Sequence, residues 1–342
     1  MMREIIELHT KLVPDLVEVL RKRYLLLKSI SHMQPIGRRA LAEEMQTTER
    51  ILRAELDVLR EAGVIFATAV GMSCTEEGNR LLEQLEPMAG ELFGLTDLAE
   101  RLKQKLKIPE VIVINGDSDL SEWVKQELGR IGARVLRQQV KEGDVVAVTG
   151  GTTIANVASH LQPSPQFRSV QFVPARGGLG ENAEIQANTL VSVMAAKSGG
   201  QYRMLHAPDR VSPEALQTLL ADQQVAEVLE LLRSARVIIH GIGDALTMAK
   251  RRKYDEGGLG ELAQAGAVGE AFGYYFNEAG EIVERVSTLG LQLEDVRSAE
   301  MVISVAGGAS KAKAILSFAQ QSCQNVLITD EGAARAILST VQ

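Results

Sequence analysis

Short apolar runs alternate with helical stretches along most of this 342-residue sequence, and this alternation constrains the fold more than any other feature. From residue 108 onward, runs rich in β-branched residues are separated by segments with helical periodicity. Apolar strands that are separated by helices are typical of a parallel sheet with helices on both faces. We therefore expect a Rossmann-like α/β body over residues 107–342, with strands at 111–115, 145–148, 170–173, 203–206, 237–240, 301–305 and 326–329.

The loop after the second expected strand has the composition of an anion-binding site. It consists of Thr149, Gly150, Gly151, Thr152 and Thr153, and a helical pattern starts directly after it. At a helix N-terminus, free backbone N–H groups and the positive end of the helix dipole point the same way, and glycine lets the backbone approach a phosphate. We interpret this loop as a phosphate-binding loop. The alternative is a tight turn whose hydroxyls serve only as helix caps.

Loops rich in glycine and small polar residues follow other expected strands as well. The segment 115–119 reads Asn-Gly-Asp-Ser-Asp, and two further loops bring a cation each, Arg176 and Lys311. Lys311 stands after two glycines and a serine at an expected helix start, which repeats the plan of the loop at 149–153. Ligands bind beyond the carboxyl ends of the strands in such sheets, so we expect these loops to converge on one rim.

A basic run and an isolated acid complete the expected site. The run 250–253 is by default a surface charge cluster, but it closely follows the loop after the fifth strand. We select Arg251 from it as a cation for a second phosphate and keep Arg252 as the alternative. Glu270 lies in an apolar, aromatic-rich stretch, where a carboxylate would accept hydrogen bonds from sugar hydroxyls. A nucleotide is not indicated, because no Walker A spacing is present and Leu246 stands where a dinucleotide fingerprint needs its third glycine.

Residues 1–75 have the pattern of a winged helix-turn-helix, which is a DNA-binding domain. A helical stretch at 16–30 is followed by a short helix at 38–45, a turn, a second helix at 48–62 and a small hairpin. The second helix would lie in the major groove. The residues predicted to contact bases or phosphates are Arg38, Arg39, Thr47, Thr48, Arg50 and Arg53. The alternative is a protein-interaction module whose arginines are merely solvated.

Residues 76–106 are expected to form a helical connector. Seven leucines and one methionine recur at steps of three and four from position 81 to position 106, although Pro87, Gly90 and Gly94 interrupt the pattern. Such a seam is typical of a coiled coil. Two interpretations stay open: the seam joins two copies of the chain, or the helix lies on its own body domain. A dimer would suit a DNA reader, since two heads can contact two half-sites.

Composition limits where the protein works and what it binds. The net charge of −7 argues against binding nucleic acid over the whole surface. The two cysteines, Cys74 and Cys323, are far apart, which indicates a reducing compartment rather than a disulfide framework. No apolar run approaches the roughly 18 residues of a membrane span, the N-terminus lacks a signal peptide's apolar core, and the histidines form no zinc pattern. We expect a cytoplasmic protein without metal or cofactor.

Beside the head, the body carries five motifs: Val148-Thr-Gly-Gly-Thr-Thr, Val173-Pro-Ala-Arg-Gly-Gly, His240-Gly-Ile-Gly, Glu270-Ala-Phe-Gly-Tyr-Tyr-Phe and Val305-Ala-Gly-Gly-Ala-Ser-Lys. Together the head and these motifs resemble the SorC family of bacterial sugar-responsive transcription regulators. The resemblance runs nearly end to end and implies a body similar to glucosamine-6-phosphate deaminase and ribose-5-phosphate isomerase, adapted from catalysis to sensing. It also implies a repressor of genes for the triose-phosphate part of glycolysis.

The same resemblance implies a ligand and an assembly. The effector would be fructose-1,6-bisphosphate, and the chain would form homodimers and homotetramers on operator DNA. Carried over by motif, Thr149 to Thr153 and Lys311 would hold one phosphate. Arg176 and Arg251 would hold the other phosphate. Glu270 and Gln186 would bind the sugar hydroxyls.

The rival interpretation is an enzyme, a sugar-phosphate isomerase or deaminase that carries a regulatory head. It would use the same loops and would need a general base beside the substrate carbons. Glu270 and Asp244 are the candidates for that base, but the sequence places no second catalytic group near them. We therefore expect a regulator without catalytic residues.

Overall fold

The structure is a computed structural model that describes residues 8, 9, 11–178 and 182–340. The chain forms two compact units, a head over residues 1–98 and a body over residues 99–342. The division at residues 75 and 106 that the sequence suggests remains a prediction. Part of the expected loop after the third strand, residues 179–181, lies outside the described residues.

The head is a winged helix-turn-helix. A core of apolar residues joins its helices to a two-stranded antiparallel hairpin, in which Ile65 pairs with Cys74. The Thr48 hydroxyl accepts a hydrogen bond from the Ile51 N–H and so caps the second helix of the motif, as its position in the sequence predicts. The elements are α2 (Pro14–Met33), α3 (Arg38–Glu44), α4 (Glu49–Glu61), β1 (Ile65–Thr68), β2 (Gly71–Cys74) and α5 (Glu76–Leu92).

The connector is not one continuous helix. Helix α5 ends at Leu92, and α6 covers Leu95–Leu106. Gly94 between them has a φ of +67°, a left-handed conformation that glycine adopts easily and that commonly ends a helix. The predicted seam is therefore shared between separate packing surfaces: Leu81 packs against the head core, whereas Leu102 is fully buried in the body. Dimerisation through the connector remains a prediction.

The body contains a seven-stranded sheet of order β3-β13-β12-β7-β4-β5-β6, and every neighbouring pair in it is parallel. The strands are β3 (Glu110–Ile114), β4 (Val145–Val148), β5 (Gln171–Pro174), β6 (Gln201–Tyr202), β7 (Val237–Gly241), β12 (Met301–Val305) and β13 (Val326–Asp330). Six of them lie where the sequence predicts strands. The strand predicted at 203–206 is wrong: β6 is a two-residue edge strand that ends at Tyr202.

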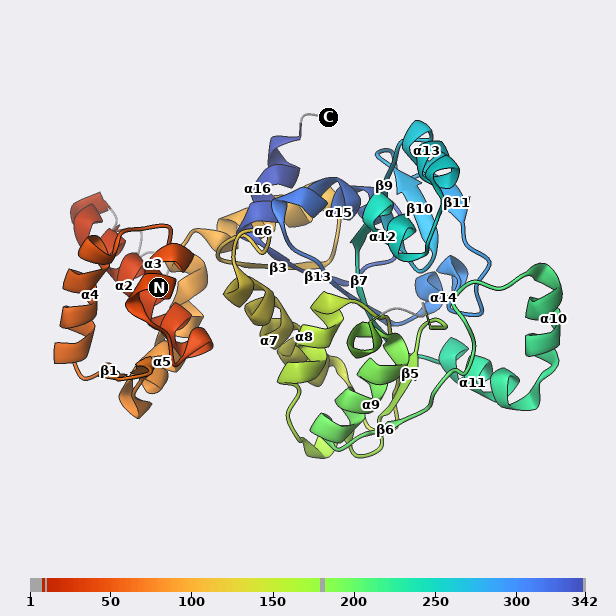
Figure 1. The fold of residues 1–342 in the computed structure, drawn as a ribbon, viewed down its shortest axis with the longest axis horizontal. Helices are drawn as coiled ribbons and strands as arrows, with labels where there is room; N and C mark the ends of the chain where they lie inside the picture. The colour runs from red at the N-terminus through yellow and green to blue at the C-terminus, as the bar shows by residue number, and fades with distance from the viewer. Residues whose placement is uncertain (1–7, 10, 179–181, 341–342) are drawn as a thin grey trace. The chain divides into compact units, whose positions relative to one another are not determined.

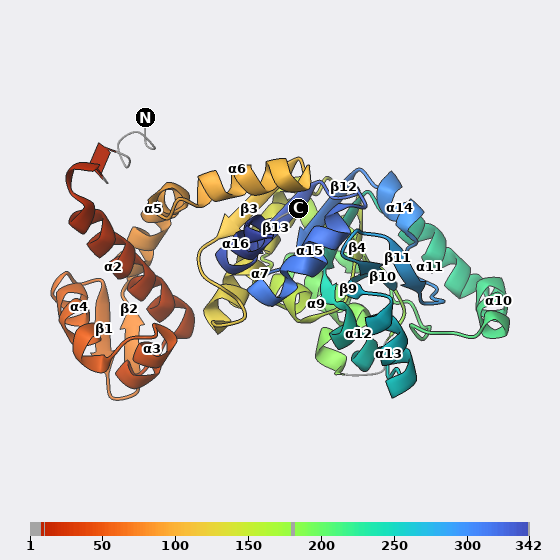
Figure 2. The same ribbon diagram turned by 90° about the horizontal axis from the view of Figure 1, so that it is seen from above.

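Helices cover both faces of this sheet. Helices α7, α8 and α9 pack side by side as one layer, and α15 packs against α16, as Figures 1 and 2 show. The connections β4–α8–β5 and β5–α9–β6 run toward one edge of the sheet, whereas β7, β12 and β13 follow one another toward the other edge. The order therefore reverses between β4 and β7, which is where doubly wound sheets form ligand sites.

The helical elements of the body are listed here with the bounds that the structure gives. They are α7 (Glu122–Gln139), α8 (Thr152–His160), η1 (Pro165–Phe167), η2 (Ala183–Ile185), α9 (Ala187–Ser198), α10 (Pro213–Ala221), α11 (Gln223–Arg233), α12 (Ala245–Arg251), α13 (Glu256–Gln264), α14 (Leu293–Ser298), η3 (Ala309–Lys311), α15 (Ala312–Ala319) and α16 (Glu331–Ser339).

A second, antiparallel sheet was not predicted from the sequence. Its order is β11-β10-β9-β8, and its strands are β8 (Gly243–Asp244), β9 (Ala267–Ala271), β10 (Tyr274–Asn277) and β11 (Ile282–Arg285). Its aromatic residues belong to the core: Tyr274, Tyr275 and Phe276 are all buried.

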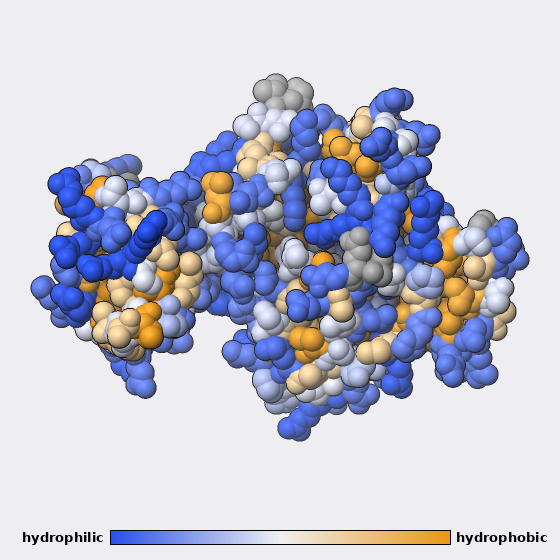
Figure 3. Space-filling view, in the orientation of Figure 1, coloured by the Kyte–Doolittle hydropathy of each residue, from blue (hydrophilic) through white to orange (hydrophobic). Residues whose placement is uncertain are grey.

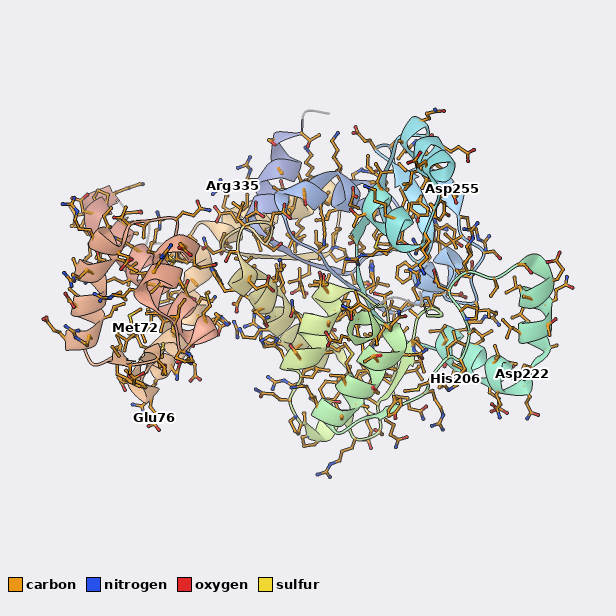
Figure 4. The ribbon with its side chains drawn as sticks, viewed as in Figure 1. Met72, Glu76, His206, Asp222, Asp255 and Arg335 are labelled. Atoms are coloured by element: carbon orange, nitrogen blue, oxygen red, sulfur yellow. The ribbon has the colours of Figure 1, made fainter. Side chains whose placement is uncertain are left out.

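The segment α10–α11 leaves the body as a short arm (Figures 1 and 4). Asp222 lies between the two helices and caps α11 through a hydrogen bond from the Val225 N–H. Hydrophobic residues gather on the surface over this arm, and Leu220 is one of them (Figure 3).

Across the residues that the structure describes, no helix is long and apolar enough to cross a membrane.

Candidate effector cavity and DNA-binding surface

A cavity of about 220 Å³ opens at the carboxyl ends of β4 and β7, where the strand order reverses. Its wall brings together all ten residues that the sequence suggests for the effector, although they come from six separate stretches of chain. They are Thr149, Gly150, Gly151, Thr152, Thr153, Arg176, Gln186, Arg251, Glu270 and Lys311. Their contact with a ligand remains a prediction.

The loop at 149–153 presents unpaired amides to this cavity. Gly151 has a φ of +113° and donates its N–H to the Ile185 carbonyl at 2.9 Å, and a Cβ on Gly150 would lie 2.7 Å from the same oxygen. Both positions therefore favour glycine. No described residue accepts a hydrogen bond from the N–H of Gly150, Thr152 or Thr153. These amides stand at the N-terminus of α8 and are free to bind an anion.

The loop at 306–311 reaches the cavity with its last two residues only. Its backbone amides are occupied by carboxylates of the chain: Gly308 N–H donates to Asp330 at 2.7 Å, and Ser310 N–H donates to Asp119 at 2.7 Å. The Asp330 carboxylate is fully buried and also accepts from the Ser118 N–H. The predicted rim loop at 115–119 therefore does not line the cavity; it fixes the loop that carries Lys311.

Lys311 and Arg251 are two cations on the cavity wall, and no described carboxylate forms an ion pair with either of them. In the described chain, neither side chain makes a hydrogen bond or an ion pair. Burial lowers the pKa of Lys311, nearby Asp119 opposes this shift, and the charge of Arg251 lowers that pKa further. Two neighbouring, partly buried cations repel each other unless an anion binds between them.

Arg176 is on the same wall but is already paired. Its Nε and Nη2 donate to the two oxygens of Asp209 at 2.6 Å each, and its Nη1 lies 3.5 Å from Oε1 of Glu270. Asp209 and Glu270 also accept hydrogen bonds from Arg252, at 3.1 and 2.7 Å. The result is a buried network of two arginines and two carboxylates.

This network sets the charge of Glu270 and settles the position of Arg252. Burial would raise the pKa of Glu270, but Arg252, Arg176 and the Gly273 N–H together hold it below its ordinary value. Arg252 is buried behind the cavity, so Arg251 is the cation of the basic run that lines it. Sequence reasoning missed Asp209, since nothing in its neighbourhood marks it as a partner of residues 33 and 43 positions away.

His240, at the end of β7, is buried and neutral. Burial lowers its pKa to about 4. Its Nδ1 lies 3.0 Å from the Gly241 carbonyl, which can only accept, so Nδ1 carries the proton and Nε2 accepts from the Ser304 hydroxyl at 2.7 Å. The ring packs between Phe272 and Phe318. It therefore serves as a fixed core residue under the cavity.

The two carboxylates that the enzyme interpretation needs as a base are both engaged. Asp244 lines the cavity, but its Oδ1 caps α12 by accepting the Thr247 N–H at 2.8 Å. Glu270 is held ionised by two arginines. Within the described ranges, no cluster of three or more potential ligand side chains is arranged to hold a metal ion.

On the head, the predicted DNA contacts lie on and beside α4. Arg50 and Arg53 are exposed, whereas Thr47 is half-buried and the hydroxyl of exposed Thr48 serves as the helix cap. Arg38 is also exposed, and Arg39 forms a surface pair with Glu43 at 3.1 Å. A groove of about 380 Å³ runs between α4 and the hairpin, and its cations are Arg38, Arg53 and Arg60.

Comparisons with known proteins cover nearly the whole chain. Residues 90–339 match a family model described as a sugar-binding domain, and residues 19–89 match one described as the CggR N-terminal DNA binding domain. A protein named "Central glycolytic genes regulator" from Priestia megaterium is 48% identical over 338 residues, which are 98% of this chain and 99% of that protein. Its namesake from Bacillus subtilis is 43% identical over 337 residues, with the same coverage.

Solved structures of regulators also match this chain. A SorC-family transcriptional regulator from Enterococcus faecalis matches with a TM-score of 0.67 and 39% identity, over 71% of this chain and all of that one. The full-length sorbitol operon regulator from Klebsiella pneumoniae has a TM-score of 0.67 at 21% identity, over 90% of this chain and 95% of that one, and so shares the fold. Likeness to the deaminase and isomerase folds remains a prediction.

Proposed function

Because the chain belongs to the SorC family of sugar-binding transcription regulators, we propose that it represses central glycolytic genes under the control of a phosphorylated sugar, fructose-1,6-bisphosphate. The chain is a DNA-binding regulator and not an enzyme, since the curated proteins that match it end to end are named regulators. We add to this that the control is repression and that the effector is a bisphosphate.

The observation that supports a phosphorylated effector is that open backbone amides lie beside two cations that form no ion pair. The N–H groups of Gly150, Thr152 and Thr153 face the same cavity as Lys311 and Arg251. A phosphate would supply acceptors for the amides and would form direct ion pairs with the two cations. We assign Arg251 to this phosphate together with Lys311, because the two charges are close enough to interact.

Other residues of the cavity wall suit the rest of a sugar phosphate. Glu270 offers a carboxylate and Gln186 an amide for hydroxyls, and Arg176 retains N–H groups for a second phosphate although its charge is shared with Asp209. A bisphosphate would thus meet its strongest site at Lys311 and a weaker one at Arg176.

Calorimetric titration of the full chain tests the effector. We expect fructose-1,6-bisphosphate to bind more tightly than fructose-6-phosphate, and unphosphorylated fructose to give no heat at similar concentrations. Binding of fructose with affinity equal to that of the bisphosphate would contradict the proposal.

Regulation requires that the ligand and the operator influence each other's binding. A coupling free energy of about 1–3 kcal/mol would change operator affinity on the order of 5–150-fold. Gel shifts with and without the bisphosphate measure this coupling and its sign. Operator affinity that does not change at saturating bisphosphate would rule out this effector.

The DNA surface has its own test. Arg50→Ala and Arg53→Ala should each weaken operator binding by about 1–3 kcal/mol, because exposed arginines at the start of α4 would contact bases or phosphates. Arg80→Ala is the matched control, since Arg80 is exposed on α5 and pairs with Glu77 at 2.8 Å. Equal gel shifts for Arg50→Ala, Arg53→Ala and the control would move the DNA surface elsewhere.

We further propose that the protein works in the cytoplasm as a homodimer or homotetramer. Paired heads would match the two half-sites of an operator. Two free, buried cysteines, Cys74 and Cys323, are compatible with a reducing compartment. Sedimentation at several concentrations, with and without operator DNA, measures the assembly.

A further inference from the structure

Arg252 is the most thoroughly enclosed cation near the cavity, and it does not line it. Its side chain is 1% exposed. Each of its three guanidinium nitrogens has a different partner: Nη2 donates to Oε1 of Glu270 at 2.7 Å, Nε to Asp209 at 3.1 Å, and Nη1 to the Tyr275 hydroxyl at 2.8 Å. Such an arrangement fixes the positions of the acceptors that surround it.

Glu270 is the acceptor that connects this group to the cavity. All three of its hydrogen bonds converge on Oε1, from Arg252, from Arg176 at 3.5 Å and from the Gly273 N–H at 2.7 Å. Its Oε2 accepts from no described residue, and that atom is not sealed inside the protein. Since Glu270 forms part of the cavity wall, Oε2 is an open acceptor there.

We propose that Arg252 is a positioning residue that aims Oε2 of Glu270 at a hydroxyl of the bound sugar. It acts entirely through Glu270 and Asp209 and never touches the ligand. This inference rests on the proposed function, because it takes the ligand to be a sugar phosphate.

In this arrangement, different residues recognise the sugar part and the phosphate part of the ligand. A carboxylate oxygen accepts a hydrogen bond from a hydroxyl but repels a phosphate, so Glu270 recognises the sugar part only. The phosphate is held by other groups, the loop at 149–153 and Lys311. Loss of Arg252 should therefore weaken binding of a sugar phosphate and spare binding of phosphate alone, whereas a general loosening of the body would weaken both.

Two probes and one variant make this test. For the full chain, the affinity of Arg252→Met for fructose-1,6-bisphosphate should fall on the order of tenfold or more, because Glu270 loses a charged hydrogen-bond donor. The affinity for inorganic phosphate, read from the dependence of the melting temperature on phosphate concentration, should stay within about twofold. Lys250→Met, which alters an exposed residue of the same basic run, should change neither affinity.

A second pair of variants covers a failure of Arg252→Met to fold. Arg252→Lys keeps the charge but cannot reach three acceptors at once, so it should show the same selective loss with a smaller amplitude. In a double-mutant cycle, Arg252→Lys should add little to Glu270→Gln, since both act through the Glu270 carboxylate.

Three results would overturn the inference: an unchanged affinity for the bisphosphate, an equal loss for both probes, or additive effects in the cycle. A wild-type chain that binds inorganic phosphate but no sugar phosphate would refute the proposed effector, and the inference with it. A wild-type chain that binds the bisphosphate while the arginine variants do so equally well would refute the inference alone.

Discussion

Two loops at the same edge of the body's main sheet share one plan. Each follows a buried strand, carries two adjacent glycines and a hydroxyl residue, and leads into a helix. The loop at 149–153 leaves the N–H groups of Gly150, Thr152 and Thr153 without a described acceptor. The loop at 306–311 has its amides filled by Asp330, Asp117 and Asp119.

The difference shows what a Gly-Gly-hydroxyl sequence does and does not specify. It specifies backbone amides that point outward, and these need acceptors. Whether the acceptor is a ligand or a carboxylate of the same chain depends on residues almost 200 positions away, such as Asp119 for Ser310. The filled loop contributes only Ser310 and Lys311 to the cavity wall, while the open loop contributes unpaired backbone amides.

The largest expected effect tests the contribution of the filled loop. Lys311→Met should weaken binding of fructose-1,6-bisphosphate about 100-fold, which is ~3 kcal/mol, because a charged contact is lost in a partly buried site. The unfolding free energy should not fall, because burial already lowers the pKa of Lys311 and so disfavours its charge. Calorimetry and urea unfolding measure the two quantities.

Lys313→Met is the matched control for this variant. Lys313 is 65% exposed and pairs with Glu278 on the surface, so the change should leave ligand affinity alone. If Lys311→Met behaved like Lys313→Met, the anion site would consist of the open loop without the lysine.

The next effect concerns the carboxylate that fills the second loop. Asp330→Asn should lower the unfolding free energy by about 2 kcal/mol, because an amide group would face N–H donors of Gly308, Ser118 or Ala333. Asp255→Asn is the control, since exposed Asp255 caps α13 with a single hydrogen bond from Gly258 and Asn caps as well. Equal stabilities of the two variants would mean that the filled loop does not depend on the Asp330 carboxylate.

A smaller effect tests the hydroxyls of the open loop. Thr153→Val preserves the shape of the side chain but removes a donor from the cavity wall, and should reduce affinity for the bisphosphate by about 1 kcal/mol. Thr189→Val, on α9 and outside the cavity wall, is the comparison. Equal affinities for the two variants would mean that only the amides of the loop bind the phosphate.

The smallest effect should have the opposite sign. Asp119→Asn removes a negative charge that partly offsets Lys311 and repels a phosphate bound beside it, so affinity for the bisphosphate should increase about twofold. This gain should shrink at high salt, because Asp119 is exposed. A loss of affinity would show that Asp119 matters mainly by fixing Ser310.

The sequence predicts the main sheet and the cavity wall well because both follow from one rule. Parallel strands end on the same edge, so glycine-rich loops after β4, β5 and β7 must meet there. The same rule does not predict which side chains form pairs. Arg251 and Arg252 are neighbours in one basic run, yet only their helical phase and the carboxylates behind them decide that Arg251 lines the cavity and Arg252 is buried.

Short elements without apolar runs were beyond sequence reasoning. Strand β8 has two residues, and β11 contains Glu284 and Arg285, so neither gives the signal of a buried strand. The segment 203–206 contains buried Leu205, but the N–H and carbonyl groups of Leu205 pair with the Asn188 side chain and not with a neighbouring strand. In the connector, leucines at helical spacing continue across Gly94 although the helix does not.

His240 provides a magnetic-resonance reporter for the state of the cavity. Its Nδ1–H bond to the Gly241 carbonyl ends on a residue of the cavity wall, and its Nε2 is anchored to Ser304 in the core. A pKa of about 4 keeps the ring neutral throughout the physiological range, so its nitrogen shifts are insensitive to pH there. With five histidines in the chain, a change in this one resonance on adding ligand would report movement of the β7 loop directly.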